Sequence, residues 1–315
     1  MPAISVIIVN WNGKDYLPTC LRSLQSQTLQ DFEVILIDNG SSDGSVEWVQ
    51  THFPWVHVVT LPCNQGFCGA NNRGIAEARG KYVVLLNNDT EADGKFLQSL
   101  FESIEAHPEA GFCATRMIRF HNRSQIDSCG IGLLPLGKGY AISAGRENQV
   151  SLGQERLVFG ACAGAALYRR SMLDQIGGFD EDFFSHVEDT DLSWRAQLAG
   201  YCCIYVPGAI VYHIGGATSR QVRDDVLFRI QRNKTWAYLK NMPLALLIFS
   251  LPFHILYSFY WLLRAAQNGQ GLIVLRALAE VIRNRPHIMK KRQQIQKDRR
   301  LSSVALLQLM DWHQI

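Results

Sequence analysis

The first 90 residues alternate short apolar runs with segments of helical periodicity, and this alternation restricts the fold more than any other feature of the chain. The apolar runs occupy residues 4–9, 33–37, 56–61 and 82–86, and the helical segments occupy 14–27, 45–51 and 67–79. Short β-branched runs of this kind are typical of strands that are buried on both faces. The alternating order predicts right-handed βαβ units and a mainly parallel sheet.

Further strands and helices are predicted around that sheet. Helices are expected at 94–106 with Asp93 as the N-cap, at 170–176 and at 189–199. Residues 110–168 alternate short apolar runs with Gly and Pro, which predicts a smaller antiparallel part, and a strand pair is expected at 202–206 and 210–213. We therefore expect an α/β, Rossmann-like domain over residues 1–221 and a helical region over 222–315.

The composition is that of a globular protein that does not bind nucleic acid. Apolar residues make up 47% of the 315 residues and charged residues 19%, which allows a sizeable core. The net charge of +3 is too small to indicate a nucleic-acid partner. The eight cysteines form no Cys-x-x-Cys pair, so we expect reduced thiols and no zinc site. The first residues lack the basic segment and cleavage site of a signal peptide, which predicts a cytoplasmic body.

An apolar segment at 242–263 dominates the C-terminal region. It is long enough to span a bilayer, but Pro252 and His254 favour a broken helix or one that lies in the membrane interface. Aromatic residues gather near its end, and ten Lys and Arg residues against two acids follow between 264 and 300. We expect a peripheral or monotopic anchor on an anionic membrane surface, at the inner face of the cytoplasmic membrane. The alternative is an apolar helix that packs against the α/β domain or against a second copy in a homo-oligomer.

Polar residues follow each of the first four predicted strands. The four segments are Asn10-Trp11-Asn12, Asp38-Asn39, Asn64-Gln65-Gly66 and Asn87-Asn88-Asp89. In open α/β sheets, ligands bind beyond the carboxyl ends of the strands. Asn and Asp also favour turns, which explains each segment singly but not their joint occurrence. The pattern predicts one crevice for a polar ligand.

Three features predict that this ligand carries phosphate. The segment 64–74 leads from a strand through glycines into a helix, where backbone N–H groups bind anions, although it lacks the dinucleotide fingerprint. Asp89 directly follows a buried strand, and one carboxylate there holds Mg²⁺ or Mn²⁺ only if substrate phosphates complete the site. His213 precedes a polar loop at 215–220 whose composition fits a phosphate.

A cluster of acids stands at the start of the predicted helix 189–199. Acids are common in the first turn of a helix because the helix dipole stabilises them, and this explains Asp191. The pair Glu188-Asp189 follows two phenylalanines, and a carboxylate in such a setting is a candidate general base.

These motifs, in this order, resemble those of family 2 glycosyltransferases. The matching segments are 6–12, 36–43, 64–74, 85–89, 159–165, 177–180, 188–192 and His213. The resemblance extends from about residue 3 to 240, and the ordered set is far more specific than any one member. It implies a GT-A fold, a nucleotide-diphosphate sugar donor and inversion at the anomeric carbon.

The resemblance also implies a role for individual residues. The donor site would comprise Val9, Asn10, Trp11, Asp38, Asn64, Gly66, Asn71, Asn72, Asn88 and Asp89. Asp38 would hydrogen-bond the pyrimidine base, Asp89 would bind the metal with His213 as a second ligand, and Asp189 would be the catalytic base. Acceptor or auxiliary positions would comprise Glu188, Asp191, Gly160 and Ala161.

The metal motif departs from the usual Asp-x-Asp of the family, because Asn87 and Asn88 precede Asp89. A single carboxylate binds a cation more weakly, so we expect metal and donor diphosphate to bind together. Within the family, the Ile-Val-Asn-Trp-Asn-Gly, Asn-x-Gly-Phe and Asn-Asn-Asp motifs resemble those of rhamnosyltransferases of cell-envelope polysaccharide synthesis. This implies L-rhamnose from a dTDP donor and a saccharide or lipid-linked saccharide acceptor.

Two alternatives to a glycosyltransferase stay open. One is a catalytically inactive, membrane-recruited nucleotide-sugar-binding protein, against which the retained Asp89 and Asp189 argue. The other is a sugar nucleotidyltransferase, which also uses a parallel sheet and a metal. Its glycine-rich basic loop should follow the first strand, where Trp11-Asn12-Gly13-Lys14 has a single glycine. A dehydrogenase is disfavoured because the dinucleotide fingerprint is missing.

Overall fold

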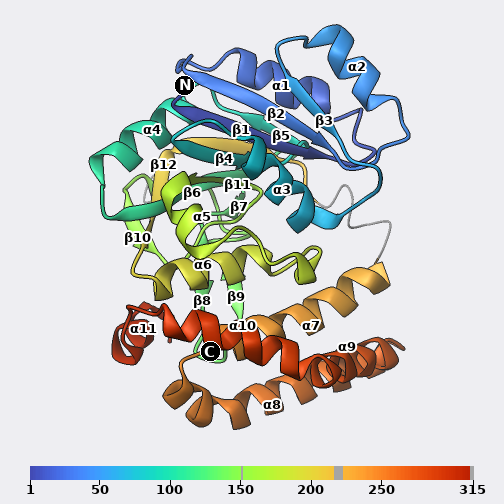
Figure 1. Cartoon of the computed structure of the whole chain (residues 1–315), viewed down its shortest axis with the longest axis vertical. Coiled ribbons are helices and arrows are strands. Elements are labelled where there is room, and N and C mark those ends of the chain that lie inside the picture. Colours follow the sequence, from blue (N-terminus) through green and yellow to red (C-terminus); the bar gives the residue numbers. More distant parts are fainter. Residues whose placement is uncertain (150–151, 216–222, 313–315) are drawn as a thin grey trace.

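The computed structural model describes residues 1–149, 152–215 and 223–312. The strands are β1 (Ile4–Asn10), β2 (Phe32–Asp38), β3 (His57–Thr60), β4 (Tyr82–Leu86), β5 (Thr90–Ala92), β6 (Ala110–Arg119), β7 (Ile126–Ser128), β8 (Ile131–Leu133), β9 (Gly139–Ala141), β10 (Arg156–Val158), β11 (Ala165–Arg169) and β12 (Cys202–His213). The helices are α1 (Leu17–Gln25), α2 (Ser45–His52), α3 (Gly66–Glu77), α4 (Phe96–Ala106), α5 (Arg170–Ile176), α6 (Glu188–Leu198), α7 (Arg223–Asn241), α8 (Leu244–Gln267), α9 (Gly271–Arg283), α10 (Arg285–Lys297) and α11 (Ser303–Leu309). In Figure 1 the sheet and its helices form the upper part of the molecule, and α7 to α11, in orange and red, form a layer below.

Ten strands of the described ranges form one sheet, in the order β10-β12-β6-β11-β4-β1-β2-β3, with β5 beside β12 and β7 beside β6. Strands β1 to β4 are parallel, and so are β6 and β12, whereas β11 runs antiparallel between β4 and β6. The predicted α/β sheet with a smaller antiparallel part is confirmed. Because β2 lies on one side of β1 and β4 on the other, the strand order reverses at β1, where open sheets bind ligands.

Apolar side chains cover both faces of β1, β2 and β4, as their unbroken apolar runs predict, whereas the edge strand β3 is only partly buried. On β1, Ile7 belongs to one buried cluster with Ile35 and Leu85. Val6 and Ile8 belong to the cluster on the other face. Each such fully buried side chain stabilises the fold by about 1.5–3 kcal/mol.

The predicted strand pair at 202–206 and 210–213 is wrong, because the chain does not reverse there. Residues Cys202–His213 form the single strand β12, which continues beside β6 with a register shift between Val206 and Ile210. Pro207 has no N–H to donate to the ladder, and a bulge is where a strand accommodates such a residue.

The start of α4 also differs from the prediction. Its N-cap is Lys95, not Asp93, and the helix begins at Phe96. The Asp93 carboxylate accepts a hydrogen bond from the Lys95 N–H at 3.0 Å, so it closes a turn just ahead of the helix.

The cysteines are reduced, as predicted. None of the eight, all within the described ranges, forms a disulfide. Five are buried, and burial raises the pKa of the Cys113 thiol to about 12, so this thiol stays protonated.

The C-terminal helices are joined to the sheet domain by an apolar cluster. Its members include Leu133, Phe159 and Trp194 from the sheet domain and Tyr238, Met242 and Leu306 from the C-terminal layer. The basic stretch between 264 and 300 lies mostly in α9 and α10, which pack against α7, and does not extend as a free tail. The predicted domain boundary at 221 falls among residues 216–222, outside the described ranges.

Candidate active site

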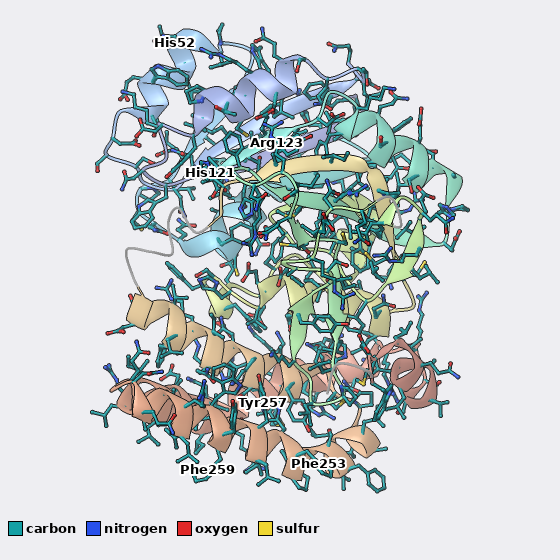
Figure 2. The ribbon with its side chains drawn as sticks, turned by 180° about the vertical axis from the view of Figure 1, so that it is seen from behind. His52, His121, Arg123, Phe253, Tyr257 and Phe259 are labelled. Atoms are coloured by element: carbon teal, nitrogen blue, oxygen red, sulfur yellow. The ribbon has the colours of Figure 1, made fainter. Side chains whose placement is uncertain are left out.

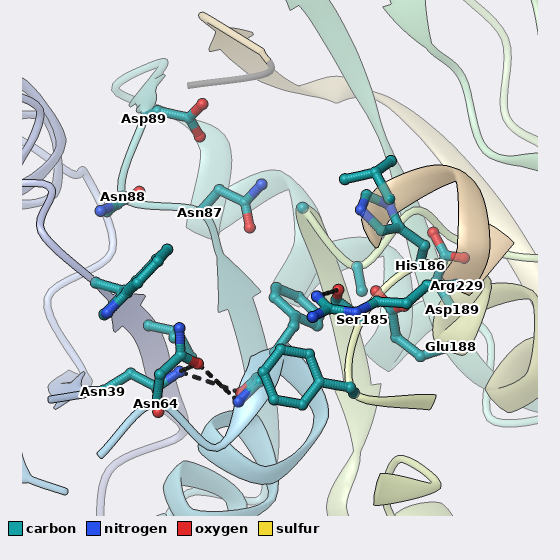
Figure 3. A pocket seen from close by; sticks show the side chains of 18 of the residues that line it. Asn39, Asn64, Asn87, Asn88, Asp89, Ser185, His186, Glu188, Asp189 and Arg229 are labelled. Carbon is teal, nitrogen blue, oxygen red and sulfur yellow. Dashed lines mark hydrogen bonds between the residues drawn. The ribbon is translucent and has the colours of Figure 1, made fainter. Parts of the chain in front are cut away.

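A cavity of about 490 Å³ opens at the carboxyl ends of the parallel strands. Its wall is formed by the residues after β1, β2, β3 and β4, by the loops before β11 and α6, and by the first turns of α7. Among the predicted site residues, it is lined by Val9, Trp11, Asn64, Gly66, Asn88, Asp89, Glu188, Asp189 and His213. Figure 3 shows Asn88 and Asp89 on one side of this pocket and Glu188, Asp189 and Arg229 on the other.

Side-chain amides order the loop that enters α3. Asn39 Nδ2 donates to Asn64 Oδ1 at 3.0 Å, and Asn39 Oδ1 accepts from the Gln65 N–H at 2.8 Å. Asn64 Oδ1 also accepts from the Gly66 N–H at 2.8 Å. These N–H groups, which the sequence offers to an anion, are therefore already paired within the loop.

A second polar network lies behind the cavity wall. Asn10 Nδ2 donates to Ser45 Oγ at 2.9 Å and contacts Asp38 Oδ1 at 3.3 Å, while Asn10 Oδ1 accepts from Asn88 Nδ2 at 2.8 Å. Asn10 and Asp38 are almost fully buried, and the Asp38 carboxylate also accepts from the Ser41 N–H. This network orients Asn88 at the cavity wall, because its partner Asn10 is itself held by Ser45 and Asp38.

Asp89, His213 and Asp127 form a line of hydrogen-bonding groups at the end of β12. His213 Nδ1 lies 2.8 Å from Asp127 Oδ2, and its Nε2 lies 3.3 Å from Asp89 Oδ1. Burial opposes charge on this ring, but the bonds to the two carboxylates outweigh it and raise the pKa of His213 to about 9. Asp127 was not identified from the sequence, because only the pairing of β6 with β7 brings it here.

The described residues contain no group of three or more His, Cys, Asp and Glu side chains arranged to hold a metal ion. Asp89 and His213 together supply one carboxylate and one imidazole nitrogen at the cavity. The polar loop at 216–220, which the sequence places after His213, lies outside the described ranges.

Asp189 and Glu188 begin α6 at the cavity wall. Asp189 Oδ1 accepts from the Thr190 N–H at 2.7 Å. Burial raises the pKa of both carboxyls, and the charge of Asp189 adds to the effect on Glu188. Among the described side chains, Glu188 Oε2 is buried without a hydrogen-bond partner. Two adjacent buried carboxyls of this kind readily share one proton, which leaves a single negative charge at the wall.

The loop before Asp189 is strained. Phe184, His186 and Val187 have φ angles of 62°, 68° and 71°, in the left-handed region that costs non-glycine residues energy. At the same place α3 approaches closely, because the Cys68 N–H donates to the Phe184 carbonyl and a Cβ on Gly66 would lie 2.5 Å from that oxygen. Gly66 is therefore needed for this contact.

Helix α7 holds the strained loop in place. Asn233, which is fully buried, donates through Nδ2 to the carbonyls of Phe183, Ser185 and His186 at 3.0, 3.0 and 2.7 Å. Arg229 donates to Ser185 Oγ at 3.2 Å and lies over the Phe184 ring at 4.1 Å.

A buried ion network joins the C-terminal helices to both ends of that loop. Lys240 on α7 pairs with Asp180 and with Asp191, the latter at 3.0 Å, and is 2% exposed. Lys291 on α10 also pairs with Asp180. Burial opposes charge on Asp191, but Lys240 and Arg195 lower its pKa below the usual range. Asp191 thus takes part in an internal network rather than facing the cavity.

Four further predicted residues lie in local structural contacts. Asn71 donates to the Phe67 carbonyl within α3, and Asn72 exchanges hydrogen bonds with the backbone of Phe179. Gly160 pairs with Ile131, and the Ala161 N–H donates to Ser193 Oγ. The neighbours 162–164 line the cavity instead.

Several lining residues were missed from the sequence. His186 and Arg229 line the cavity, and so does Asn39, which the sequence placed at the crevice only as part of the segment Asp38-Asn39. Arg229 shares a face of α7 with Asp225 and Val226, which also line it, so helical spacing was the one available signal. Nothing in the sequence indicates that this face of α7 lies at the same cavity as Asn87, which is more than 130 residues earlier in the chain.

The sequence matches the profile of the family described as Glycosyl transferase family 2 over residues 5–177. It is 30% identical over 233 residues to an N-acetylglucosaminyl-diphospho-decaprenol L-rhamnosyltransferase of Mycobacterium tuberculosis, covering 67% of this chain and 75% of the relative. It is 29% identical over 277 residues to a poly-beta-1,6-N-acetyl-D-glucosamine synthase of Staphylococcus epidermidis, covering 82% of this chain and 62% of that protein.

Solved structures show the same fold. A crystal structure of S. aureus TarS 1-349 in complex with UDP superposes with a TM-score of 0.56 and 18% identity, covering 99% of this chain and 93% of that one. A crystal structure of GalNAc-T7 with UDP, GalNAc and Mn²⁺ has a TM-score of 0.61 and 16% identity, covering 76% and 48%. At these identities the likeness concerns the fold alone, which is the GT-A fold.

Proposed function

Because this chain belongs to glycosyl transferase family 2, we propose that it transfers a sugar from a nucleotide-diphosphate donor to a saccharide or lipid-linked acceptor, with inversion at the anomeric carbon. The observation that carries the proposal is the placement of Asp89 and Asp189 on opposite sides of one cavity (Figure 3). Inversion needs a base on the side of the anomeric carbon opposite the departing diphosphate. Asp189 is placed to be that base, and Asp89 lies on the side proposed for the diphosphate.

In the proposed reaction, Asp189 is the catalytic base. The acceptor oxygen forms a bond to the anomeric carbon while the bond from that carbon to the diphosphate oxygen breaks. The acceptor hydroxyl proton goes to the Asp189 carboxylate, and the electron pair of the broken bond leaves with the diphosphate. Burial raises the pKa of Asp189, which makes its carboxylate a better proton acceptor. Glu188 retains a proton beside it, so the pair carries one charge.

Asp89 and His213 are proposed to hold a divalent cation together with the donor diphosphate. Their donor set fits Mg²⁺ or Mn²⁺ once His213 has released its Nε2 proton, and Asp127 at Nδ1 keeps Nε2 directed at the Asp89 side. A bound cation supplies positive charge to the leaving diphosphate. Two protein ligands leave the remaining positions to phosphate oxygens and water, so metal and donor should bind cooperatively.

The wall formed by Val9, Trp11, Asn64 and Asn88 is proposed to bind the nucleotide and donor sugar, with Asp38 reaching the base from behind it. The name of the relative from M. tuberculosis includes a rhamnosyl donor group and a diphospho-linked acceptor. We extend this to dTDP-L-rhamnose as the donor.

Arg229 lies on the Asp189 side of the pocket and would bind a diphosphate of the acceptor (Figure 3). Arg229→Gln should raise the acceptor KM while donor binding is unchanged; an unchanged KM would remove this role.

The enzyme is further proposed to work at the cytoplasmic face of the membrane. The name of the relative from M. tuberculosis includes decaprenol, a lipid, and α8 is the one helix of the described ranges that is long and apolar enough to cross a membrane. The acceptor of such an enzyme would be presented at a lipid surface.

Thermal unfolding with a panel of nucleotide sugars, with and without Mn²⁺ or Mg²⁺, tests the donor. The true donor should raise Tm more with the cation than without it, because a ligand stabilises the folded state that binds it. Product analysis by NMR should then give the anomeric configuration opposite to that of the donor. Retention of configuration, or stabilisation by nucleoside triphosphates alone, would contradict the proposal.

A further inference from the structure

Helix α8 has two faces of opposite character. The outer face is apolar and exposed, with fractional exposures between 55% and 77% for Leu244, Ile248, Phe249, Phe253, Leu256 and Phe259. Residues 244–263 contain no charged side chain. Figure 2 shows Phe253 and Phe259 at the outer edge of the molecule and Tyr257 on the inner side of the helix. A continuous exposed apolar face of this size marks an interaction surface.

The inner face of α8 is fixed to the protein by polar contacts. His254 is 4% exposed; its Nδ1 lies 2.9 Å from the Leu136 carbonyl, and its ring stacks on Tyr238 at 3.9 Å. One turn earlier, Ser250 Oγ lies 2.7 Å from the Tyr238 hydroxyl. These contacts hold the middle of the helix against α7 and the hairpin of β8 and β9.

Two lysines extend this attachment toward the end of the helix. Lys234 lies over the Tyr257 ring at 4.9 Å and over the Trp261 ring at 5.7 Å, and Lys138 lies over Tyr257 at 5.9 Å. Neither lysine forms an ion pair with any acid of the described ranges. Burial, and to a lesser degree Lys138, lower the pKa of Lys234 to about 7. A negative charge brought near Lys234 would therefore favour the charged form of this lysine, which burial disfavours.

We propose that the outer face of α8 inserts into the surface of an anionic lipid bilayer and lies in its plane, without spanning it. This inference rests on the proposed membrane location and specifies its geometry. If α8 crossed the bilayer, His254, Lys234 and Lys138 would have to leave their contacts or enter hydrocarbon, which is costly. An in-plane helix keeps the inner contacts and buries its apolar face by about 5–10 Å.

The charge around α8 favours lipid over a second copy of the chain. Arg264, Arg276 and Arg283 are exposed on α8 and α9, and none forms an ion pair within the described part of the chain. Two copies that met through this face would bring these like charges together, whereas phosphate headgroups would neutralise them. Leu272 and Ile282 on α9, which packs against α8, are exposed as well.

Vesicle flotation of the full chain, without donor or acceptor, tests the proposal. The protein should float with vesicles that contain phosphatidylglycerol and bind pure phosphatidylcholine vesicles less well. Phe249→Gln with Phe253→Gln should weaken binding by about tenfold or more, because each removes a large apolar group from the interface. Leu157→Gln is the control, since Leu157 is comparably exposed at 64% but lies on β10, and it should bind as the parent does.

The charge variant Arg276→Gln with Arg283→Gln gives an independent readout if the phenylalanine variant misfolds. It should lose binding to anionic vesicles only, and added salt should have the same effect on the parent. Resistance of bound protein to alkaline carbonate extraction would indicate a spanning helix and overturn the proposal. The proposal would also be overturned if the parent formed a dimer and did not bind vesicles, and if the phenylalanine variant were monomeric. Donor-induced thermal stabilisation, measured without vesicles, reports separately on the transferase.

Discussion

The two sides of the active-site cavity are built in different ways. The side with Asn64, Asn88 and Asp89 rests on parallel strands, and its side chains are fixed by neighbours on the same sheet edge. The side with Asp189 rests on a strained loop that α7 and α10 hold from outside the sheet. Donor binding should therefore depend on the first 90 residues and on His213, and proton transfer should depend on the C-terminal helices as well.

This difference links the proposed membrane contact to catalysis. Helix α7 holds the loop before Asp189 through Asn233, and the same helix is packed against α8 through Tyr238 and Lys234. A single helix thus connects the face proposed to meet lipid with the proposed catalytic base. The two sides of the cavity can be separated by substitutions that affect one and leave the other intact.

Asp189→Asn should separate them most sharply. It removes the base, so kcat should fall by about a thousandfold or more, whereas the donor should still raise Tm with the cation present. Asp89→Asn should abolish the cation-dependent rise in Tm itself. Transfer at the parental rate by Asp189→Asn would eliminate this residue as the base.

Lys240→Met should have the next largest effect, on stability. It leaves Asp180 and Asp191 buried with fewer positive partners, and breaking one partner of a buried network costs about 3 kcal/mol. Urea denaturation should show the loss. Lys95→Met, on the exposed N-cap of α4, is the control and should change little. If the network is the cause, Asp191→Asn combined with Lys240→Met should be less unstable than the sum of the single variants.

Asn233→Leu should reduce kcat by about tenfold to a hundredfold, because three loop carbonyls lose their donor and the loop can leave its strained conformation. The donor-induced rise in Tm should be retained, since the opposite side of the cavity is untouched. Asn284→Leu is the control, because the Asn284 side chain, between α9 and α10, bonds only to Glu280 among the described residues. An equal loss of donor binding and kcat in Asn233→Leu would show that the two sides are not separable.

The same difference explains how far the sequence could predict the site. The donor side follows from local rules: apolar runs define parallel strands, and parallel strands bring Asn64, Asn88 and Asp89 to one edge. Asn39, which orders the loop, adjoins a predicted residue, yet its contacts become visible only in the fold. The resemblance to the family identified Asp189 from the motif around it.

What holds Asp189 could not be predicted, because it depends on contacts across long stretches of chain. Asn233 and Lys240 look like ordinary polar positions of a mixed helix, and Asp191 like a helix-dipole acid. Their partners at 180–191 are some 50 residues away, and no local periodicity relates the two segments. Similarly, Pro207 predicts the end of a strand. The chain instead continues through a bulge, because β12 pairs with β6 on both sides of it.

The smallest expected effect concerns Glu188 and its pH dependence. Burial, reinforced by Asp189, raises the pKa of Glu188 to about 8 in the folded protein, above its ordinary value near 4.5. The folded state therefore holds this proton more tightly than the unfolded chain, so the parent should lose stability as pH rises from about 4.5 to 8. Glu188→Gln cannot ionise and should lose less, becoming more stable than the parent by about 1 kcal/mol or more above pH 8. Urea titrations at several pH values measure this difference. Parallel curves for the two proteins would mean that the charge on this side of the cavity is shared in another way, with Asp189 retaining the proton.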